Sequence, residues 1–291
     1  MARDIALLTN PKSGKGKGGR ILDQVLPQLR SAGFAVRSLQ GRDADEALDL
    51  AHEVVRDGVE TLAVVGGDGM VHLAIQALAH SETRLGLIPA GTGNDMARYL
   101  GLPRKDAAAA VDVLSRGKER TIDLAKAGPT YYVTVAACGF DAIVNERANT
   151  MTWPKGQMRY NIASVAELRT FKPIPYVIEV DGVEHRFEAM TVAVGNGESF
   201  GGGLQITKGA ALDDGLLDIV AVGPLTKPQF LRLYPKLFSG THVTHPAYMH
   251  FSGRSVTVAA PGITAYADGE RLAELPLTID IAPQALRVVV P

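Results

Sequence analysis

Apolar and polar positions follow two different periods along the first 125 residues. Short apolar runs typical of strands take turns with segments whose apolar residues recur every three or four positions, as in amphipathic helices. We expect strands over 5–9, 35–39, 61–65 and 85–88, helices over 20–32 and 44–57, a third helix ending at residue 79 and a fourth after residue 95. This alternation predicts a doubly wound, mostly parallel sheet.

The pattern changes after about Thr121, where short strands dominate. We expect strands over 131–137, 176–180, 183–187, 191–194 and 216–222, and several beyond residue 248. Asp181-Gly182 and Asp268-Gly269 are hairpin signals, and Asp214-Gly215 is a third turn candidate. The second half therefore predicts an antiparallel, β-rich domain.

One helix is clear in this second half, with Thr226 as N-cap and its end at Phe238. Four apolar side chains share one of its faces: Phe230, Tyr234, Leu237 and Phe238. Such a stripe can contact lipid, but packing in the core is the favoured interpretation.

Charge, cysteine content and the length of apolar runs argue against several classes of protein. The net charge is −1, which argues against a broad nucleic-acid interface. The single cysteine, Cys138, excludes an internal disulfide, and its apolar neighbours predict a buried, inert thiol that suits a reducing cytosol. No signal peptide is expected, and no run approaches the ~20 apolar residues that a membrane helix needs.

Three glycine-rich loops follow three predicted strands. They are Asn10-Pro11-Lys12-Ser13-Gly14-Lys15, Gly66-Gly67-Asp68-Gly69 and Gly91-Thr92-Gly93-Asn94-Asp95. In a parallel sheet such loops lie at the carboxyl ends of the strands, where ligands bind, and glycine lets the backbone approach phosphate closely. The alternatives are a connecting loop, an Asp-Gly turn and an N-cap at Asn94 or Asp95.

Other site motifs are absent from the sequence. Gly14, Gly16 and Gly19 match GxGxxG, but no acid ends the second strand, and there is no Walker loop. Neither HExxH nor GxSxG occurs. We interpret His242 and His245, which have a metal-like spacing in an irregular loop, as surface histidines.

These loops together resemble the catalytic domain of the diacylglycerol kinase and sphingosine kinase superfamily. Landmarks in the second half occur in the order of that family: Gly139-Phe140-Asp141, Gly195-Asn196-Gly197, Phe200-Gly201-Gly202-Gly203, Asp213-Asp214-Gly215-Leu216-Leu217-Asp218 and Asp268-Gly269-Glu270. The chain is most similar to the soluble bacterial diacylglycerol kinases, over nearly its whole length.

The resemblance implies a fold and a set of roles. Residues 1–125 would form an ATP-binding domain similar to NAD kinase and phosphofructokinase, and 126–283 a β-sandwich-like lipid domain, with the strand near 284–291 returning to the first domain. ATP would contact Asn10, Pro11, Lys12, Ser13, Gly14, Gly66, Gly67, Asp68, Gly69 and Thr92. Lys15 would hold phosphates, Glu270 would be the general base, and Asp68 and Asp95 would serve magnesium through water. A structural magnesium would take Asp214 and the carbonyls of Ala211 and Leu216.

The expected protein is cytoplasmic and peripheral at the inner membrane surface, where it meets its lipid, and a homodimer is left open. Three positions depart from the family pattern: Met70 after the second loop, Lys208 before the acidic turn, and the segment 40–43. The lipid could be diacylglycerol, a sphingoid base, ceramide or phosphatidylglycerol. Two other functions stay open, which are a soluble-acceptor kinase such as NAD kinase and a nucleotide-binding regulator with a decayed site.

Overall fold

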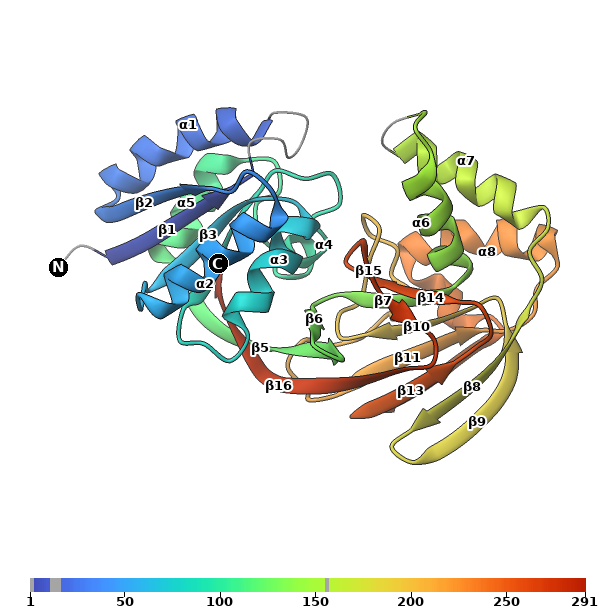
Figure 1. Ribbon diagram of the computed structural model, residues 1–291. Coiled ribbons are helices and arrows are strands. Elements are labelled where there is room, and N and C mark those ends of the chain that lie inside the picture. Colours follow the sequence, from blue (N-terminus) through green and yellow to red (C-terminus); the bar gives the residue numbers. More distant parts are fainter. Residues whose placement is uncertain (1–2, 11–16, 155–156) are drawn as a thin grey trace. The chain divides into compact units, whose positions relative to one another are not determined.

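The computed structural model of the protein describes residues 3–10, 17–154 and 157–291. Contacts divide the chain into two compact units. Unit 1 comprises Met1–Leu124, Leu212–Asp214 and Ala282–Pro291, and unit 2 comprises Ala125–Ala211 and Gly215–Ile281. Each unit has its own sheet arrangement (Figure 1).

Unit 1 is a parallel sheet covered by helices on both faces. Its elements are β1 (Arg3–Thr9), α1 (Lys17–Ser31), β2 (Phe34–Gln40), α2 (Ala44–Arg56), β3 (Thr61–Gly66), α3 (Asp68–Leu78), β4 (Arg84–Pro89), α4 (Asp95–Tyr99), α5 (Ala107–Arg116) and most of β5 (Lys118–Ala127). The strand order is β2-β1-β3-β4-β16, in which β16 is the last strand of the chain (Leu277–Val290), and each neighbouring pair runs parallel. This confirms the predicted doubly wound sheet.

Both faces of this sheet are buried, so its central strands are apolar throughout. Ile5 and Leu7 of β1 pack in one cluster with Val25 of α1 and Leu114 of α5. The alternate positions of these strands are also buried, on the side of α2 and α3. Continuous apolar runs in β1, β3 and β4 are typical of parallel strands that are covered on both faces.

Unit 2 contains two antiparallel sheets. Its elements are β6 (Thr130–Tyr132), β7 (Val135–Gly139), α6 (Phe140–Thr150), α7 (Gln157–Leu168), β8 (Ile174–Val180), β9 (Val183–Ala189), β10 (Thr191–Gly195), β11 (Leu217–Val222), α8 (Lys227–Ser239), the 3₁₀ helix η2 (Thr241–Thr244), β12 (Tyr248–Gly253), β13 (Ser255–Ala259), β14 (Thr264–Ala267), β15 (Glu270–Glu274) and the start of β16 (Leu277–Val290). One sheet has the order β12-β11-β10-β7-β14-β15, and the other contains β16-β13-β8-β9.

Alternation along the strands of unit 2 builds two apolar layers. Val192, Val194 and Ile219 point into the core between the sheets, with Val256 and Ile279 from the second sheet. Intervening residues of β10 and β11 pack instead with Leu233 of α8. The second half is thus an antiparallel sandwich with helices on one outer face, which confirms the predicted fold class.

Helices α6 and α7 were not predicted from the sequence, and neither were α5 and β5. The expected strand over 131–137 is two strands, β6 and β7, which are interrupted at Val133 and Thr134. By contrast, the two hairpin signals are correct. Asp181-Gly182 joins β8 to β9 and Asp268-Gly269 joins β14 to β15, with positive φ at all four residues.

Two single-residue predictions have opposite outcomes. Cys138 is fully buried as expected, and burial raises the pKa of its thiol. The prediction that His242 lies at the surface is wrong. Its ring is buried, with Nε2 3.0 Å from the carbonyl oxygen of Ile206 and an edge contact to Tyr248. This places Nε2 within hydrogen-bond distance of a backbone acceptor inside the protein.

Within the described ranges, no helix combines the length and the apolar character needed to cross a membrane. The stripe expected on α8 is split between two environments. Phe230 and Leu237 pack in the interior of unit 2, as the core interpretation predicted, whereas Phe238 is exposed.

Candidate active site

Three strands of unit 1 end at the same edge of the parallel sheet. Thr9 pairs with Val65, so Asn10 and Gly66 leave neighbouring strands together, and Gly66 pairs with Pro89 of β4. Each of these strand ends leads into one of the glycine-rich loops. This edge is the carboxyl end of the sheet, where open α/β sheets bind ligands.

The second and third glycine loops touch through their backbones. A Cβ added to Gly67 would lie 2.9 Å from Cα of Gly91, and one added to Gly91 would lie 2.5 Å from Cα of Gly67. Only glycine permits this approach, because a side chain at either position would overlap the other loop. Gly66 is restricted by a different neighbour, the side chain of Met70, which lies 2.5 Å from a Cβ built there.

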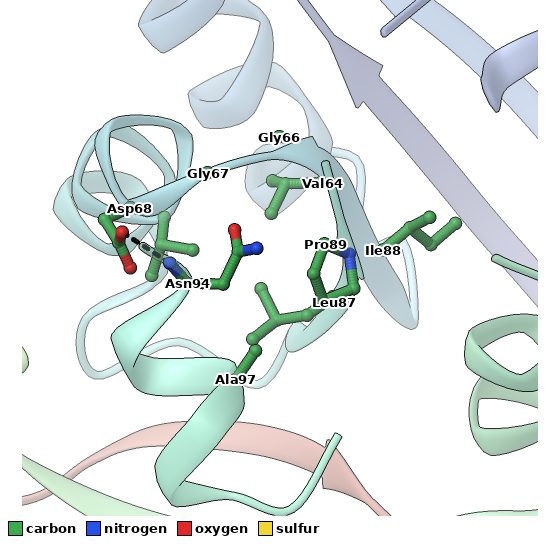
Figure 2. A pocket seen from close by; sticks show the side chains of 10 residues that line it. Val64, Gly66, Gly67, Asp68, Leu87, Ile88, Pro89, Asn94 and Ala97 are labelled. Carbon is green, nitrogen blue, oxygen red and sulfur yellow. Dashed lines mark hydrogen bonds between the residues drawn. The ribbon is translucent and has the colours of Figure 1, made fainter. Parts of the chain in front are cut away.

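Asp68 connects the same two loops through its carboxylate. Oδ2 accepts a hydrogen bond from the backbone N–H of Asn94 at 2.8 Å, and Oδ1 accepts one from Asp95 at 2.7 Å. Figure 2 shows the carboxylate directed at the backbone of Asn94. Asp68 therefore fixes the loop that carries Thr92 and Asp95, in addition to any role toward a ligand.

Asn94 is a residue of this site that the sequence reading did not select. Its backbone is left-handed, with φ 53° and ψ 50°, a conformation that Asn tolerates better than most residues. Its side chain accepts from the N–H of Gly91 at 3.1 Å and donates to the carbonyl of Gly91 at 2.9 Å. Asn94 occupies the N-cap position of α4, but its side chain makes no capping bond and closes the loop instead.

A small pocket opens between these loops and the ends of β3 and β4, with about 210 Å³ of empty space that is open to solvent (Figure 2). It is lined by Val64, Gly66, Gly67, Asp68, Val71, Leu87, Ile88, Pro89, Asn94 and Ala97. Asp95 is buried beside it, and its Oδ1 lies 3.8 Å from Nε of Arg98. Arg98 also donates to the carbonyl of Gly93 at 3.1 Å, which braces the third loop.

Of the first glycine loop, only Asn10 lies within the described residues. Pro11, Lys12, Ser13, Gly14 and Lys15 lie outside the described residues, and Asn10 lies at the end of β1. Thr92 is exposed on the third loop, and Gly69 lies in the first turn of α3. The geometry thus brings together Gly66, Gly67, Asp68 and Asp95.

Within unit 1, Asp123 and Arg120 hold the acidic turn near Asp214. The backbone N–H of the buried Asp123 donates to the carbonyl of Leu212 at 2.6 Å, and its Oδ1 accepts from the N–H of Gln284 at 2.7 Å. Arg120 pairs with Asp213 at 2.8 Å. Asp214 itself is exposed.

The magnesium site predicted at this turn uses a single carboxylate. It combines Asp214 with two backbone carbonyls, those of Ala211 and Leu216. In the described part of the chain, no group of three or more His, Cys, Asp or Glu side chains is placed to hold a metal ion.

In unit 2, Glu270 is exposed and follows the Asp268-Gly269 turn. Asp268 of this turn is hydrogen-bonded to the segment between β6 and β7. Oδ1 and Oδ2 of Asp268 accept from the backbone N–H groups of Thr134 and Val133, each at 3.1 Å, and the hydroxyl of Thr134 also donates to Oδ1. Asn196 donates to the carbonyl of Val133 at 3.2 Å. The Gly195–Gly197 and Asp268–Glu270 landmarks therefore meet at the break between β6 and β7.

A second acid of unit 2, Asp141, is half-buried. It lies in the first turn of α6, accepts a hydrogen bond from the hydroxyl of Thr191, and has its pKa raised by desolvation. Its neighbour Phe140 contacts Phe171 and Phe230 edge-on, with ring centroids 5.1 Å and 4.8 Å apart. The Gly139–Asp141 landmark is thus a structural junction between β7 and the helices.

Known proteins match the chain over both units. The diacylglycerol kinase catalytic domain matches residues 4–127, and the YegS C-terminal NAD kinase β-sandwich-like domain matches residues 134–290. A diacylglycerol kinase of Mycobacterium tuberculosis (strain ATCC 25618 / H37Rv) is 42% identical over 293 residues, covering 99% of this chain and 95% of that protein. One from Bacillus subtilis (strain 168) is 28% identical, covering 87% of this chain and 84% of that protein.

The fold has a solved counterpart. A crystal structure of a diacylglycerol kinase from Bacillus anthracis str. Sterne superposes with a TM-score of 0.77 at 23% identity, covering 99% of this chain and 97% of that one. The motif resemblance, the two domain matches and the identity over nearly the full length agree. The chain belongs to the bacterial diacylglycerol kinase family.

Proposed function

We propose that this enzyme transfers the γ-phosphoryl group of ATP to the free hydroxyl of diacylglycerol, which yields phosphatidic acid and ADP. The observation that supports this most is the backbone contact between Gly67 and Gly91 at the carboxyl end of the parallel sheet. Bare backbone there leaves space for phosphates to approach the loops closely. The relatives named diacylglycerol kinase supply the acceptor.

The nucleotide would bind on unit 1. Gly66, Gly67 and Thr92 would line it beside Asn10 and the segment Pro11–Gly14, and Lys15 would neutralise phosphate charge. Phosphoryl transfer needs positioning and charge stabilisation more than covalent work by the protein. A loop pair fixed by Asp68 and Asn94 supplies such positioning without a Walker motif.

Magnesium fits the donors that this chain offers, because carboxylate and carbonyl oxygens are the ligands that it prefers. Asp214, with the carbonyls of Ala211 and Leu216, would hold a structural ion, and Asp68 and Asp95 would serve the nucleotide's ion through water. When bound, the ion neutralises charge on the phosphates. The anchoring of the turn by Asp123 and Arg120 supports this assignment, since a fixed turn presents its oxygens in a fixed geometry.

Glu270 would act as the general base. It would accept the proton of the acceptor hydroxyl as the new O–P bond forms and the bond to the leaving ADP oxygen breaks. Its place directly after a pinned two-residue turn supports this role, because the carboxylate starts from a fixed backbone.

A transfer assay with γ-labelled ATP and a panel of acceptors tests the proposal. The panel holds diacylglycerol, a sphingoid base, ceramide, phosphatidylglycerol and NAD, each with magnesium and with excess chelator. We expect label in diacylglycerol, lost with chelator. Labelling of NAD without any lipid would refute the proposal, and labelling of another lipid alone would replace the acceptor.

A further inference from the structure

Exposed apolar side chains are concentrated on one part of unit 2. Among the residues that the structure describes, seven large apolar side chains are exposed, and six of them lie in segment 153–165 or on α8. They are Trp153, Met158, Ile162, Val165, Leu231 and Phe238. Trp153 is the most exposed, at 76%. Such a concentration marks an interaction surface more often than scattered single residues do.

Helix α7 is apolar on two opposite sides. Tyr160, Ala163 and Leu168 pack into the cluster that also contains Phe140 of α6. Met158, Ile162 and Val165 follow the i, i+4, i+7 spacing of a single stripe on the other side, and all three are exposed. Packing within unit 2 explains the first stripe and leaves the second without a role in the core.

Helix α8 repeats this arrangement. Phe230, Leu233 and Leu237 face the interior of unit 2. Leu231 and Phe238 lie on the opposite side, in line with the exposed Pro235 between them. We call Met158, Ile162, Val165, Leu231 and Phe238, together with Trp153, the apolar stripes.

The two helices are joined, and α8 carries positive charge. Lys227, in the first turn of α8, donates through Nζ to the carbonyl of Arg169 just after α7. Phe230 of α8 shares a cluster with Ala163 of α7. Helix α8 carries Lys227, Arg232 and Lys236, all exposed, and no acid. The single acid of α7, Glu167, is paired with Arg147.

We propose that the apolar stripes, with the cations of α8, form the surface by which this protein docks on an anionic lipid bilayer. Apolar and aromatic side chains that enter the headgroup region, beside lysine and arginine that attract anionic lipid, are the features of an interfacial helix. A second copy of the chain fits less well. A two-fold interface through these helices would bring the cations of both copies together.

This inference rests on the proposed function for its biological purpose, since a bilayer acceptor requires bilayer contact, but its test needs neither ATP nor diacylglycerol. The full chain is sedimented with vesicles of phosphatidylcholine and phosphatidylglycerol, and with vesicles of phosphatidylcholine alone. Val165→Glu and Leu231→Glu are compared with Val183→Glu. These three side chains are 63%, 59% and 58% exposed, and Val183 lies outside the stripes on the β8–β9 hairpin.

We expect wild type to bind the anionic vesicles and to bind phosphatidylcholine weakly. Val165→Glu and Leu231→Glu should each weaken anionic binding by about tenfold, and Val183→Glu should leave it unchanged. Lys236→Ser should weaken binding about fivefold at low salt and less at high salt.

Kinase assays separate this inference from the proposed function. The stripe variants should lose activity on diacylglycerol in vesicles and keep it on short-chain diacylglycerol in detergent. If no diacylglycerol is phosphorylated but vesicle binding still depends on the stripes, the docking surface stands and the proposed acceptor fails. The inference is overturned if wild type does not bind anionic vesicles, if Val183→Glu weakens binding as much, or if the stripe variants change only the oligomeric state.

Discussion

Asp68 is the residue through which one glycine loop fixes the other. Replacing it with Ala leaves the N–H groups of Asn94 and Asp95 without their acceptor. We expect Asp68→Ala to lower the free energy of unfolding by about 2 kcal/mol, as for loss of hydrogen bonds to a charged group. Urea unfolding measures the change.

Asp112→Ala is the matched control for this variant. Asp112 is exposed on α5 and pairs with Arg116 one turn away, at 3.0 Å. Removing such a surface pair should cost at most about 0.5 kcal/mol. Equal losses in the two variants would show that Asp68 does not hold the loops.

The variant Glu270→Gln tests whether Glu270 is the general base. Glu270→Gln keeps the size and polarity of the side chain but cannot accept the proton. We expect turnover to fall by ~10²–10⁴-fold. ATP binding should persist, because the glycine loops belong to unit 1. Glu274→Gln, on the same strand and also exposed, should retain activity. Near wild-type turnover of Glu270→Gln would move the proton acceptor elsewhere, with Asp68 the next candidate.

His242 makes stability depend on pH. Burial lowers its pKa below the ordinary 6.5, and this effect exceeds the opposite influence of the carbonyls of Ile206 and Lys236. The unfolded chain therefore binds the proton more readily, so the stabilisation is complete above 6.5 and is lost as pH falls through the lowered folded value. We expect the free energy of unfolding to drop over that range. His242→Leu should flatten this part of the profile, and an unchanged slope would contradict the assignment.

At the scale of elements, the sequence pattern is informative where a helix or strand buries one defined side. Strands β1, β3 and β4 and helices α1 and α2 follow their predicted ranges to within a few residues. Helix α7 escaped prediction because apolar residues occupy both of its sides, which removes the one-sided periodicity that marks an amphipathic helix.

Long-range hydrogen bonds explain the other element-level differences. The break between β6 and β7 depends on Asp268, which lies 134 residues from Thr134 in the sequence. The burial of His242 depends on a carbonyl 36 residues away. No local pattern encodes either pairing, so the sequence alone could not reveal them.

The two Asp-Gly hairpins offer a matched pair of variants. Asp181 and Asp268 both have positive φ, and each carboxylate accepts from two consecutive backbone N–H groups where the chain passes between strands, at 254–255 and 133–134 respectively. We expect Asp181→Ala and Asp268→Ala each to destabilise the protein by about 2 kcal/mol, measured by thermal unfolding.

Activity distinguishes the two hairpins. Only Asp268 lies beside Glu270, so Asp268→Ala should also reduce turnover, whereas Asp181→Ala should leave turnover unchanged below its unfolding temperature. If both variants retain full activity, the turn is not what positions Glu270.

In the molecule as a whole, the sequence motifs identified the residues of the candidate site better than the residues that hold its loops and turns in place. The glycine loops and the acids Asp68 and Asp95 lie at one sheet edge, and the sequence indicated them because strand ends in a parallel sheet share an edge. Asn94 was expected only as a loop residue or an N-cap, Asp268 only as part of a hairpin turn and a family landmark, and Asp123 was not singled out. Their partners lie on other loops and strands, so only the folded chain shows their role in holding the candidate site.

In the proposed reaction, this fold transfers the γ-phosphoryl group of ATP to diacylglycerol. The most direct measurement is the yield of phosphatidic acid and ADP from diacylglycerol vesicles, ATP and magnesium, for wild type and for Gly91→Val. A Val side chain at Gly91 overlaps the backbone of Gly67 and the side chain of Asn94. We predict equal amounts of the two products from wild type and little of either from the variant. ADP without phosphatidic acid, or full activity in Gly91→Val, would contradict the account.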